Sequence, residues 1–251
     1  MLDRITPLIL CRNEEPNIGR TLAQLAWAKE VVVVDSFSTD ATTEIARTFP
    51  NVRLVQRPFD TMARQWNFGI EQIGTEWVLT LDADYFMPES FTRELASLQP
   101  SPEVSGYEAS FIYAINGRPL RATLYTPRVV LLRMGRFTIF QDGHTQRVRV
   151  DGRTEALTER LVHDDRKSWS RFIERQKSYM RQEAHKLRTA EPHTLNLAAR
   201  IRKLRIVAPL VVMPYTLFVQ RLILDGRAGL RYAAERFVAE VILMRELWRR
   251  R

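Results

Sequence analysis

Trp77-Val-Leu-Thr-Leu-Asp82-Ala-Asp84 decides the fold, because this stretch joins a buried-strand pattern directly to two closely spaced carboxylates. The run from Trp77 to Leu81 predicts a strand, and both aspartates follow at its carboxyl end. Ligands that offer only oxygen favour Mg²⁺ or Mn²⁺ bound jointly with phosphates. An isolated Asp-x-Asp also fits a solvated turn, so the interpretation depends on the rest of the chain.

Strand and helix patterns alternate through the N-terminal third of the chain. Short apolar runs predict strands, and apolar residues at helical spacing predict the helices between them. Such alternation is expected of βαβ units that feed a parallel sheet. The predicted strands are residues 5–11, 31–34, 52–55 and 77–81, and the predicted helices are residues 17–28, 39–49 and 62–73, with Asp40 available as a cap.

The middle of the chain changes to strand-like runs broken by glycine and proline. Residues 107–115 and 129–134 are the clearest of these runs. They predict an antiparallel edge or a small second sheet. Residues 168–187 then predict a basic amphipathic helix.

Residues 206–220 form an uncharged segment of 15 residues between Arg205 and Arg221. A bilayer span needs about 20 apolar residues, and this segment is shorter and contains two prolines. Its basic flanks favour a helix lying in the membrane interface or a re-entrant element. The alternative is a pair of core-packing helices with solvated arginines, the second of them following the turn at residues 225–227.

Composition and charge limit the classes of function. With 251 residues and 45% hydrophobic content, the chain can form one domain of about 150 residues plus a substantial extension. Residues 1–159 carry 17 Lys/Arg and 20 Asp/Glu, a net charge of −3, whereas residues 160–251 carry 21 and 9, a net charge of +12. The basic part predicts a surface for a polyanion, namely nucleic acid, anionic lipid or a phosphorylated acceptor. The single cysteine, Cys11, fits a reducing compartment, and we expect no signal peptide ahead of the first strand.

Acidic and amide residues also follow the other predicted strands. Arg12-Asn13-Glu14-Glu15 follows the first strand, and the segment from Asp35 to Asp40 follows the second. The carboxyl ends of parallel strands meet at one edge, where such groups suit ribose hydroxyls and base edges. The chain has neither Gly-x-Gly-x-x-Gly nor Gly-x-x-x-x-Gly-Lys. These observations favour a nucleotide whose diphosphate is held by a metal.

Together these segments resemble a known family. Residues 9–15, 31–40, 64–70 and 77–84, in this order and spacing, look like the donor half of family 2 glycosyltransferases with the GT-A fold. Residues 142–146, 163–167 and 225–230 are similar to the branch that includes lipopolysaccharide-core β-glucosyltransferases. The resemblance covers nearly the whole chain.

The resemblance implies an α/β fold of the GT-A nucleotide-diphospho-sugar transferase type, with a mostly parallel central sheet. We expect a catalytic domain at residues 1–165, with a donor-binding half over 1–100 and an acceptor half over 101–165. Residues 166–251 would be a basic amphipathic helical extension associated with a membrane.

The resemblance also implies roles for single residues. Asp35 matches the aspartate that binds the nucleoside, and Glu14 and Asn67 stand near the same base and ribose. The complete donor-binding set is Arg12, Asn13, Glu14, Asp35, Arg64, Asn67 and Asp82.

Asp82 and Asp84 match the family's metal and diphosphate motif, and Asp84 is the expected direct ligand of Mg²⁺ or Mn²⁺. His163 falls where many GT-A enzymes place a late histidine that touches the metal or the diphosphate. A hydrogen-bonded structural role is the alternative for His163.

Family members are typically inverting, so a base must take the proton of the acceptor hydroxyl. Asp142 is the first candidate for this catalytic role, and a loop cap is its alternative. The chain has His144-Thr145-Gln146 where relatives carry His-Glu, so His144 is a second candidate base.

The sequence therefore predicts a metal-dependent hexosyltransferase-like enzyme. Its expected donor is a nucleotide-diphosphate sugar, with a UDP-sugar favoured, and its expected acceptor is a cell-envelope glycan or a lipid-linked saccharide. We expect it in the cytoplasm, peripheral at the inner face of the cytoplasmic membrane, with no nucleic-acid partner. The alternatives are a sugar nucleotidyltransferase, whose usual glycine-rich loop is missing, and a non-catalytic scaffold for membranes or polyanions.

Overall fold

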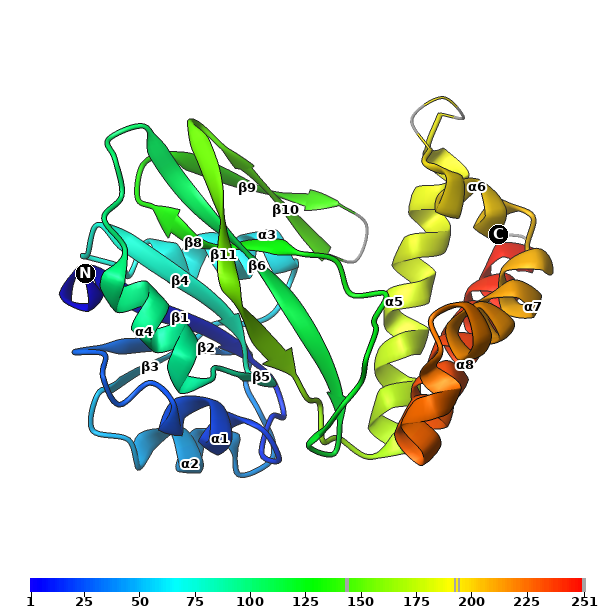
Figure 1. Ribbon diagram of the computed structural model, residues 1–251, viewed down its shortest axis with the longest axis horizontal. Helices are drawn as coiled ribbons and strands as arrows, with labels where there is room; N and C mark the ends of the chain where they lie inside the picture. The colour runs from blue at the N-terminus through cyan, green and yellow to red at the C-terminus, as the bar shows by residue number, and fades with distance from the viewer. Residues whose placement is uncertain (143–144, 192, 194, 250–251) are drawn as a thin grey trace.

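The computed structural model describes residues 1–142, 145–191, 193 and 195–249 (Figure 1). It has an α/β body followed by a set of helices. The body is built on one large sheet with the strand order β3-β2-β1-β4-β8-β6-β11-β5, and β7 pairs with β6. The α/β fold that the sequence predicted, with a mostly parallel central sheet and C-terminal helices, is confirmed.

The parallel part of the sheet comes from the N-terminal strands. In it, β1 lies between β2 and β4, and β3 pairs with β2 at the edge. These strands are β1 (Ile5–Cys11), β2 (Val31–Asp35), β3 (Val52–Gln56) and β4 (Trp77–Asp82). Every residue of β2 is buried, as expected for a β-branched strand covered on both faces.

Helices cover both faces of this sheet. Apolar residues of α1, α2 and α4 pack with Ile9, Val31 and Val33 on one face, and α3 packs with Leu8, Val32 and Val34 on the other. The helices are α1 (Ile18–Ala23), α2 (Thr42–Arg47), α3 (Met62–Ile70) and α4 (Glu89–Ser97), and a short 3-10 turn, η1 (Leu2–Arg4), precedes β1.

All three predicted helices of the N-terminal third are shorter than the sequence pattern indicated, and the third, predicted at residues 62–73, ends at Ile70. The first ends at Ala23, and turns complete the connection to β2. The second begins at Thr42 because the residues before it bind the neighbouring loop: Ser38 accepts from the Asn13 amide at 2.8 Å, and Asp40 accepts from the Thr42 amide at 3.1 Å. Asp40 thus supports the start of this helix, as predicted.

The middle of the chain extends the sheet and adds a hairpin. β8 (Arg128–Arg133) is antiparallel to both β4 and β6 (Val104–Ile115), and β6 is parallel to β11 (Arg153–His163). β5 (Tyr85–Phe86) and β7 (Arg118–Pro119) are short antiparallel additions. β9 (Phe137–Asp142) and β10 (Thr145–Val150) form a separate hairpin against α3. The predicted strands at residues 107–115 and 129–134 are therefore present, but they lie inside the large sheet and not at its edge, and the small second sheet comes from residues 137–150.

The C-terminal part is helical. α8 packs along α5, and α7 packs on α8 (Figure 1). The elements are α5 (Trp169–Thr189), α6 (Leu197–Lys203), α7 (Val207–Pro214), the π-helical turn η3 (Tyr215–Val219), the 3-10 turn η4 (Leu222–Asp225) and α8 (Gly226–Trp248).

Within the described part of the chain, no single helix is both long and apolar enough to cross a membrane. Taken together, the segments 207–219 and 222–248 are long and apolar enough to cross a membrane, but they are bent by 71° relative to each other.

Candidate active site

The candidate site lies where the parallel strands β1, β2 and β4 end. The loops that follow them carry Glu14, Asp40 and Asp84 to the same edge of the sheet, as open α/β folds do at their binding edge. The end of β11 joins them because it pairs with β5, with His163 opposite Tyr85. The Asp164 amide donates to the Asp84 carbonyl oxygen at 3.1 Å, which fixes the late segment beside the Asp82-Ala-Asp84 motif.

Asp84 and His163 form a buried pair. Nε2 of His163 lies 3.5 Å from Oδ2 of Asp84, and both side chains are about nine-tenths buried. The His163 ring stacks on Tyr113 with a centroid distance of 4.6 Å, so its orientation is fixed. Burial raises the pKa of Asp84 above its ordinary value, and the nearby His163 opposes this increase.

These groups fit a divalent cation. Oδ1 of Asp84 is buried and has no hydrogen-bond partner among the described residues, which marks it as an oxygen available to a ligand. Asp82, whose side chain is 30% exposed, lies beside the pair at the mouth of a cavity. Within the described residues, no three His, Cys, Asp or Glu side chains are grouped so that they could hold a metal ion by themselves. Asp84 and His163 could supply only part of the ligands of Mg²⁺ or Mn²⁺, and phosphate oxygens of a bound nucleotide would have to supply others.

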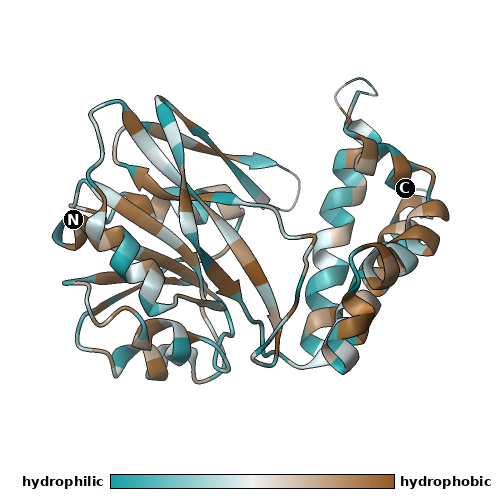
Figure 2. Ribbon diagram, viewed as in Figure 1, coloured by the Kyte–Doolittle hydropathy of each residue, from teal (hydrophilic) through white to brown (hydrophobic). Residues whose placement is uncertain are grey.

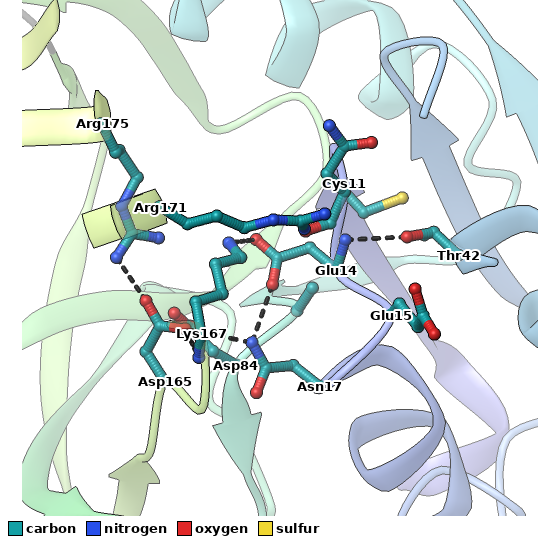
Figure 3. Close-up of polar contacts among 12 residues, drawn as sticks. Cys11, Glu14, Glu15, Asn17, Thr42, Asp84, Asp165, Lys167, Arg171 and Arg175 are labelled. Atoms are coloured by element: carbon teal, nitrogen blue, oxygen red, sulfur yellow. Dashed lines mark hydrogen bonds and ion pairs between the residues drawn. The ribbon is translucent and has the colours of Figure 1, made fainter. Parts of the chain in front are cut away.

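A set of buried ion pairs surrounds Asp84 (Figure 3). Lys167 forms an ion pair with Glu14, which also accepts from Nδ2 of Asn17 at 2.9 Å. Burial raises the pKa of Glu14 to about 7, although Lys167 and Asn17 act in the opposite direction. The Glu14–Lys167 pair therefore brings one positive and one negative group next to the candidate cation site.

Asp165 belongs to the second buried ion pair near Asp84. It pairs with Arg175 of α5 and accepts from Nδ2 of Asn17 at 3.2 Å and from the Lys167 amide at 3.1 Å. Burial alone would raise the pKa of Asp165, but the charges of Arg175 and Lys167 outweigh burial and lower it. Asn17 thus connects the loop after β1 to the segment after β11.

Arg171 of α5 joins the two donor-side loops. Its guanidinium donates to the Asn13 carbonyl oxygen at 3.0 Å and to Asp40 at 3.1 Å. Asn13 has a left-handed backbone with φ of 56°, and its side-chain oxygen accepts from the Thr39 amide at 2.8 Å. The loops after β1 and β2 are consequently held together by the first turn of the helical extension.

Asp35 is fully buried at the end of β2. Its carboxylate accepts from the amide and hydroxyl of Ser38 and from Nε2 of Gln56 at 2.9 Å, and the Cys11 thiol lies 3.6 Å away. In this arrangement Asp35 braces the loop that carries Ser38. A direct contact with a nucleoside stays a prediction.

The remaining predicted donor residues lie apart from the Asp84 pair. Arg12 is exposed, and Arg64 is an exposed residue of α3 that pairs with Asp60 at 3.1 Å. Asn67 donates to the Ile139 carbonyl oxygen at 3.3 Å and so connects α3 to β9. The structure thus brings Glu14, Asp82, Asp84 and His163 together. Arg12, Arg64 and Asn67 are not part of this group.

Asp142 and Asp82 line the same cavity of about 470 Å³. Oδ1 of Asp142 lies 2.7 Å from Nζ of Lys186, and Oδ2 lies 2.5 Å from Nε of Arg147. Burial would raise the pKa of Asp142, but these two cations lower it below its ordinary value. His144, the second candidate base, lies outside the described residues.

Sequence reasoning did not assign roles to Asn17, Asp165, Lys167, Arg171 or Arg175. The segment from His163 to Lys167 contained a signal, because it resembled a branch of the family. The partners of Arg171 and Arg175 are 131 and 10 residues away in sequence, and no local pattern identifies such pairs.

The curled, mostly parallel sheet with the C-terminal helices has the GT-A type of fold. The mannosyltransferase PcManGT of Pyrobaculum calidifontis, solved with GDP-Man and Mn²⁺, has this fold, with a TM-score of 0.53 at 18% identity over 98% of this chain and 87% of that one. A model of glycosyl transferase family 2 matches residues 8–160, so the chain belongs to glycosyl transferase family 2.

Curated relatives agree with this assignment. The lipopolysaccharide core biosynthesis glycosyltransferase LpsC of Rhizobium meliloti is 29% identical over 111 residues, which are 42% of this chain and 41% of LpsC. An uncharacterized glycosyltransferase of Rickettsia typhi is 29% identical over 109 residues, which are 43% of this chain and 37% of that protein. The match spans about two-fifths of the length of each relative.

Proposed function

We propose that this glycosyltransferase is inverting and metal-dependent, and that it moves a hexose from a nucleotide-diphosphate sugar, with a UDP-sugar favoured, to an acceptor hydroxyl. The observation that carries this proposal is the buried Asp84–His163 pair, whose neighbour in sequence, Asp82, lines the same cavity as Asp142. Such a cavity can place a donor diphosphate and an acceptor hydroxyl on opposite sides of one sugar carbon.

Asp82, Asp84 and His163 would hold the divalent cation, which offsets the charge that develops on a leaving diphosphate. The unpartnered Oδ1 of Asp84 supports this assignment. Lys167 and Arg175 place fixed positive charges in the same region, where they stabilise negative charge without reorganising.

The transfer step exchanges one bond at the anomeric carbon for another. The acceptor oxygen forms a bond to that carbon from one face, while the bond to the diphosphate oxygen breaks on the other. The acceptor proton passes to a carboxylate oxygen of Asp142, and the nucleoside diphosphate leaves with the bonding electrons. A positioned base of this kind contributes about 10²- to 10⁴-fold to the rate.

The acceptor in this proposal is a cell-envelope glycan or lipid-linked saccharide at the inner face of the cytoplasmic membrane. The name of the LpsC relative supports the envelope role. The net charge of +12 on residues 160–251 supports a location at an anionic surface.

A panel of nucleotides tests the donor and metal assignments together. UDP, GDP, ADP, CMP and dTDP would each be titrated calorimetrically with and without Mn²⁺. We expect one nucleoside diphosphate to bind only with Mn²⁺, and Asp84→Asn to abolish that binding. Because burial penalises the charged form of Asp84, the neutral amide leaves the fold at least as stable, which thermal unfolding measures.

Asp151→Asn is the matched control, because Asp151 is exposed in the turn between β10 and β11. It should bind the nucleotide like the wild type. Equal binding by Asp84→Asn and the wild type would refute the metal site. Exchange of pyrophosphate into the sugar nucleotide would instead identify a nucleotidyltransferase, and failure of all five nucleotides would favour a scaffold.

A further inference from the structure

The helical extension exposes an unusual amount of apolar surface. Along α7, η3 and η4, large apolar side chains point into solvent, with Leu210 66%, Phe218 64% and Val219 68% exposed. We define the apolar face by six of these exposed residues: Leu210, Val211, Phe218, Val219, Ile223 and Leu224. Contiguous exposed apolar patches on soluble proteins mark sites of interaction.

The helices and turns of this segment pack against different parts of the molecule. α8 packs along α5, and α7 packs on α8 (Figure 1). η4 lies next to the α/β body, because Leu222 packs with Tyr113 and the Asp225 carboxylate accepts from the Arg121 amide at 3.0 Å. Colouring by hydropathy shows apolar ribbon along α7 and the adjoining part of α8 (Figure 2).

Positive charge flanks the uncharged stretch that carries Leu210, Val211, Phe218 and Val219. Residues 206–220 contain no charged side chain, and Arg205 and Arg221 bracket them. Both arginines are exposed, and among the described residues neither forms a salt bridge. Both also have left-handed backbone conformations, with φ of 62° and 58°, which are rare for long side chains.

We propose that the apolar face rests in the headgroup region of an anionic membrane, with Arg205 and Arg221 against the lipid phosphates. An apolar strip with basic ends matches such an interface in both polarity and charge. A second copy of this chain is a poorer match, because a two-fold axis through the face would bring the unpaired arginines of both copies together.

The dimensions of the segment favour an interfacial position. The 13 residues from Val207 to Val219 reach about 20 Å as a helix, whereas the hydrocarbon core is about 30 Å thick. The 71° bend then turns the chain away into α8. The segment can therefore lie along one surface of the membrane without crossing it.

Vesicle co-sedimentation tests this proposal. The full chain would be mixed at low salt with vesicles of equal parts phosphatidylglycerol and phosphatidylcholine, and with vesicles of phosphatidylcholine alone. We expect at least tenfold tighter binding to the anionic vesicles. The variant Leu210→Ser with Phe218→Ser should lose at least tenfold of this affinity, because two exposed apolar side chains no longer enter the interface.

Phe59→Ser is the matched control, since Phe59 is an exposed aromatic residue, 43% accessible, on the catalytic body. It should bind vesicles like the wild type. Undiminished vesicle binding by the Leu210→Ser, Phe218→Ser variant would overturn the proposal. So would a dimer in vesicle-free sedimentation velocity that this variant dissociates, because the face would then belong to a second copy.

A charge variant examines the basic ends separately. Arg205→Asn with Arg221→Asn removes both charges while keeping residues that tolerate left-handed backbone. We expect a clear loss of affinity for the anionic vesicles and little change for the neutral ones. An equal loss for both compositions would contradict the role of these arginines. Nucleotide binding by every variant is a separate readout, so failure of the membrane proposal is distinguishable from failure of the donor site.

Discussion

At the scale of single residues, Asp142 is held by two cations. Lys186 comes from α5 and Arg147 from β10, so the candidate base is positioned by two different parts of the chain. A carboxylate with both oxygens paired accepts a proton weakly. Proton transfer to Asp142 therefore requires the acceptor to displace at least one of these contacts.

The same ion pairs make stability depend on pH. The pKa of Asp142 is lowered in the folded state, so its contribution is present above its unfolded pKa of about 3.9 and disappears as pH falls through the folded value. We expect Asp142→Asn to reduce the free energy of unfolding by about 1 kcal/mol at pH 7. The difference from the wild type should shrink toward zero at the lowest pH where both proteins fold.

Urea unfolding of both proteins from pH 7 downward measures this difference. Asp151→Asn again serves as the control, because its exposed side chain should give no such trend. A difference between Asp142→Asn and the wild type that grew at low pH would contradict the assigned ion pairs.

At the scale of elements, α3 lies very close to the sheet. A Cβ on Gly69 would meet Cδ1 of Leu8 at 2.6 Å and Cγ2 of Val34 at 3.1 Å, both on buried strands. We expect Gly69→Ala to lower the free energy of unfolding by about 1–3 kcal/mol, because α3 must move away from the sheet. The midpoint of urea unfolding, with an unchanged slope, measures the loss.

Gly74→Ala is the matched control, because a Cβ there meets nothing within 4 Å. Alanine also restricts the unfolded chain, so this variant should be neutral or more stable by about 0.4–1 kcal/mol. Equal destabilisation by both substitutions would show that close packing is not the cause.

The elements that the sequence predicted are those with strong local patterns. A run of four valines predicts β2. The strand that ends at Asp82 leads into Asp82-Ala-Asp84, the motif from which a metal site was predicted. β11 was missed because Glu155 and Glu159 occupy partly buried positions of its alternation, which weakens the apolar pattern. β5 has only two residues and exists through its pairing with β11, so no local pattern could predict it.

The same distinction applies to the candidate site. Asp82, Asp84 and His163 could be proposed from motifs, and the structure places them together. In the sequence, Arg175 is one of several basic residues on an amphipathic helix. Only the structure shows that it forms an ion pair with Asp165. Its role depends on tertiary contacts, which neither residue type nor spacing encodes.

At the scale of the whole molecule, the helical extension contacts the candidate site through ion pairs of α5. Arg175 of α5 pairs with Asp165, which is mostly buried behind the Asp84 pair. We expect Arg175→Met to destabilise the protein by about 3 kcal/mol, because it leaves a buried carboxylate without its cation. The variant should also bind the nucleoside diphosphate more weakly, which calorimetry at a temperature well below unfolding measures.

Arg93→Met removes an exposed partner of Glu89 on α4 and is the control for loss of an arginine. It should change stability by less than about 1 kcal/mol and leave nucleotide affinity unaltered. Normal affinity in the Arg175→Met protein would mean that α5 supports the fold without contributing to the donor site.

Hydrogen bonds from Asn17 to Asp165 and from Arg171 to Asn13 join segments that are synthesised far apart in time. The parallel strands emerge early during synthesis, but the loops after them acquire their partners only about 150 residues later. Bacterial and eukaryotic ribosomes add about 5–20 residues per second, so the unfinished sheet waits roughly 8–30 seconds with these loops unsupported. A nascent chain stalled before α5 would contain every strand that the structure describes and yet lack a completed site, so catalytic competence appears late in translation.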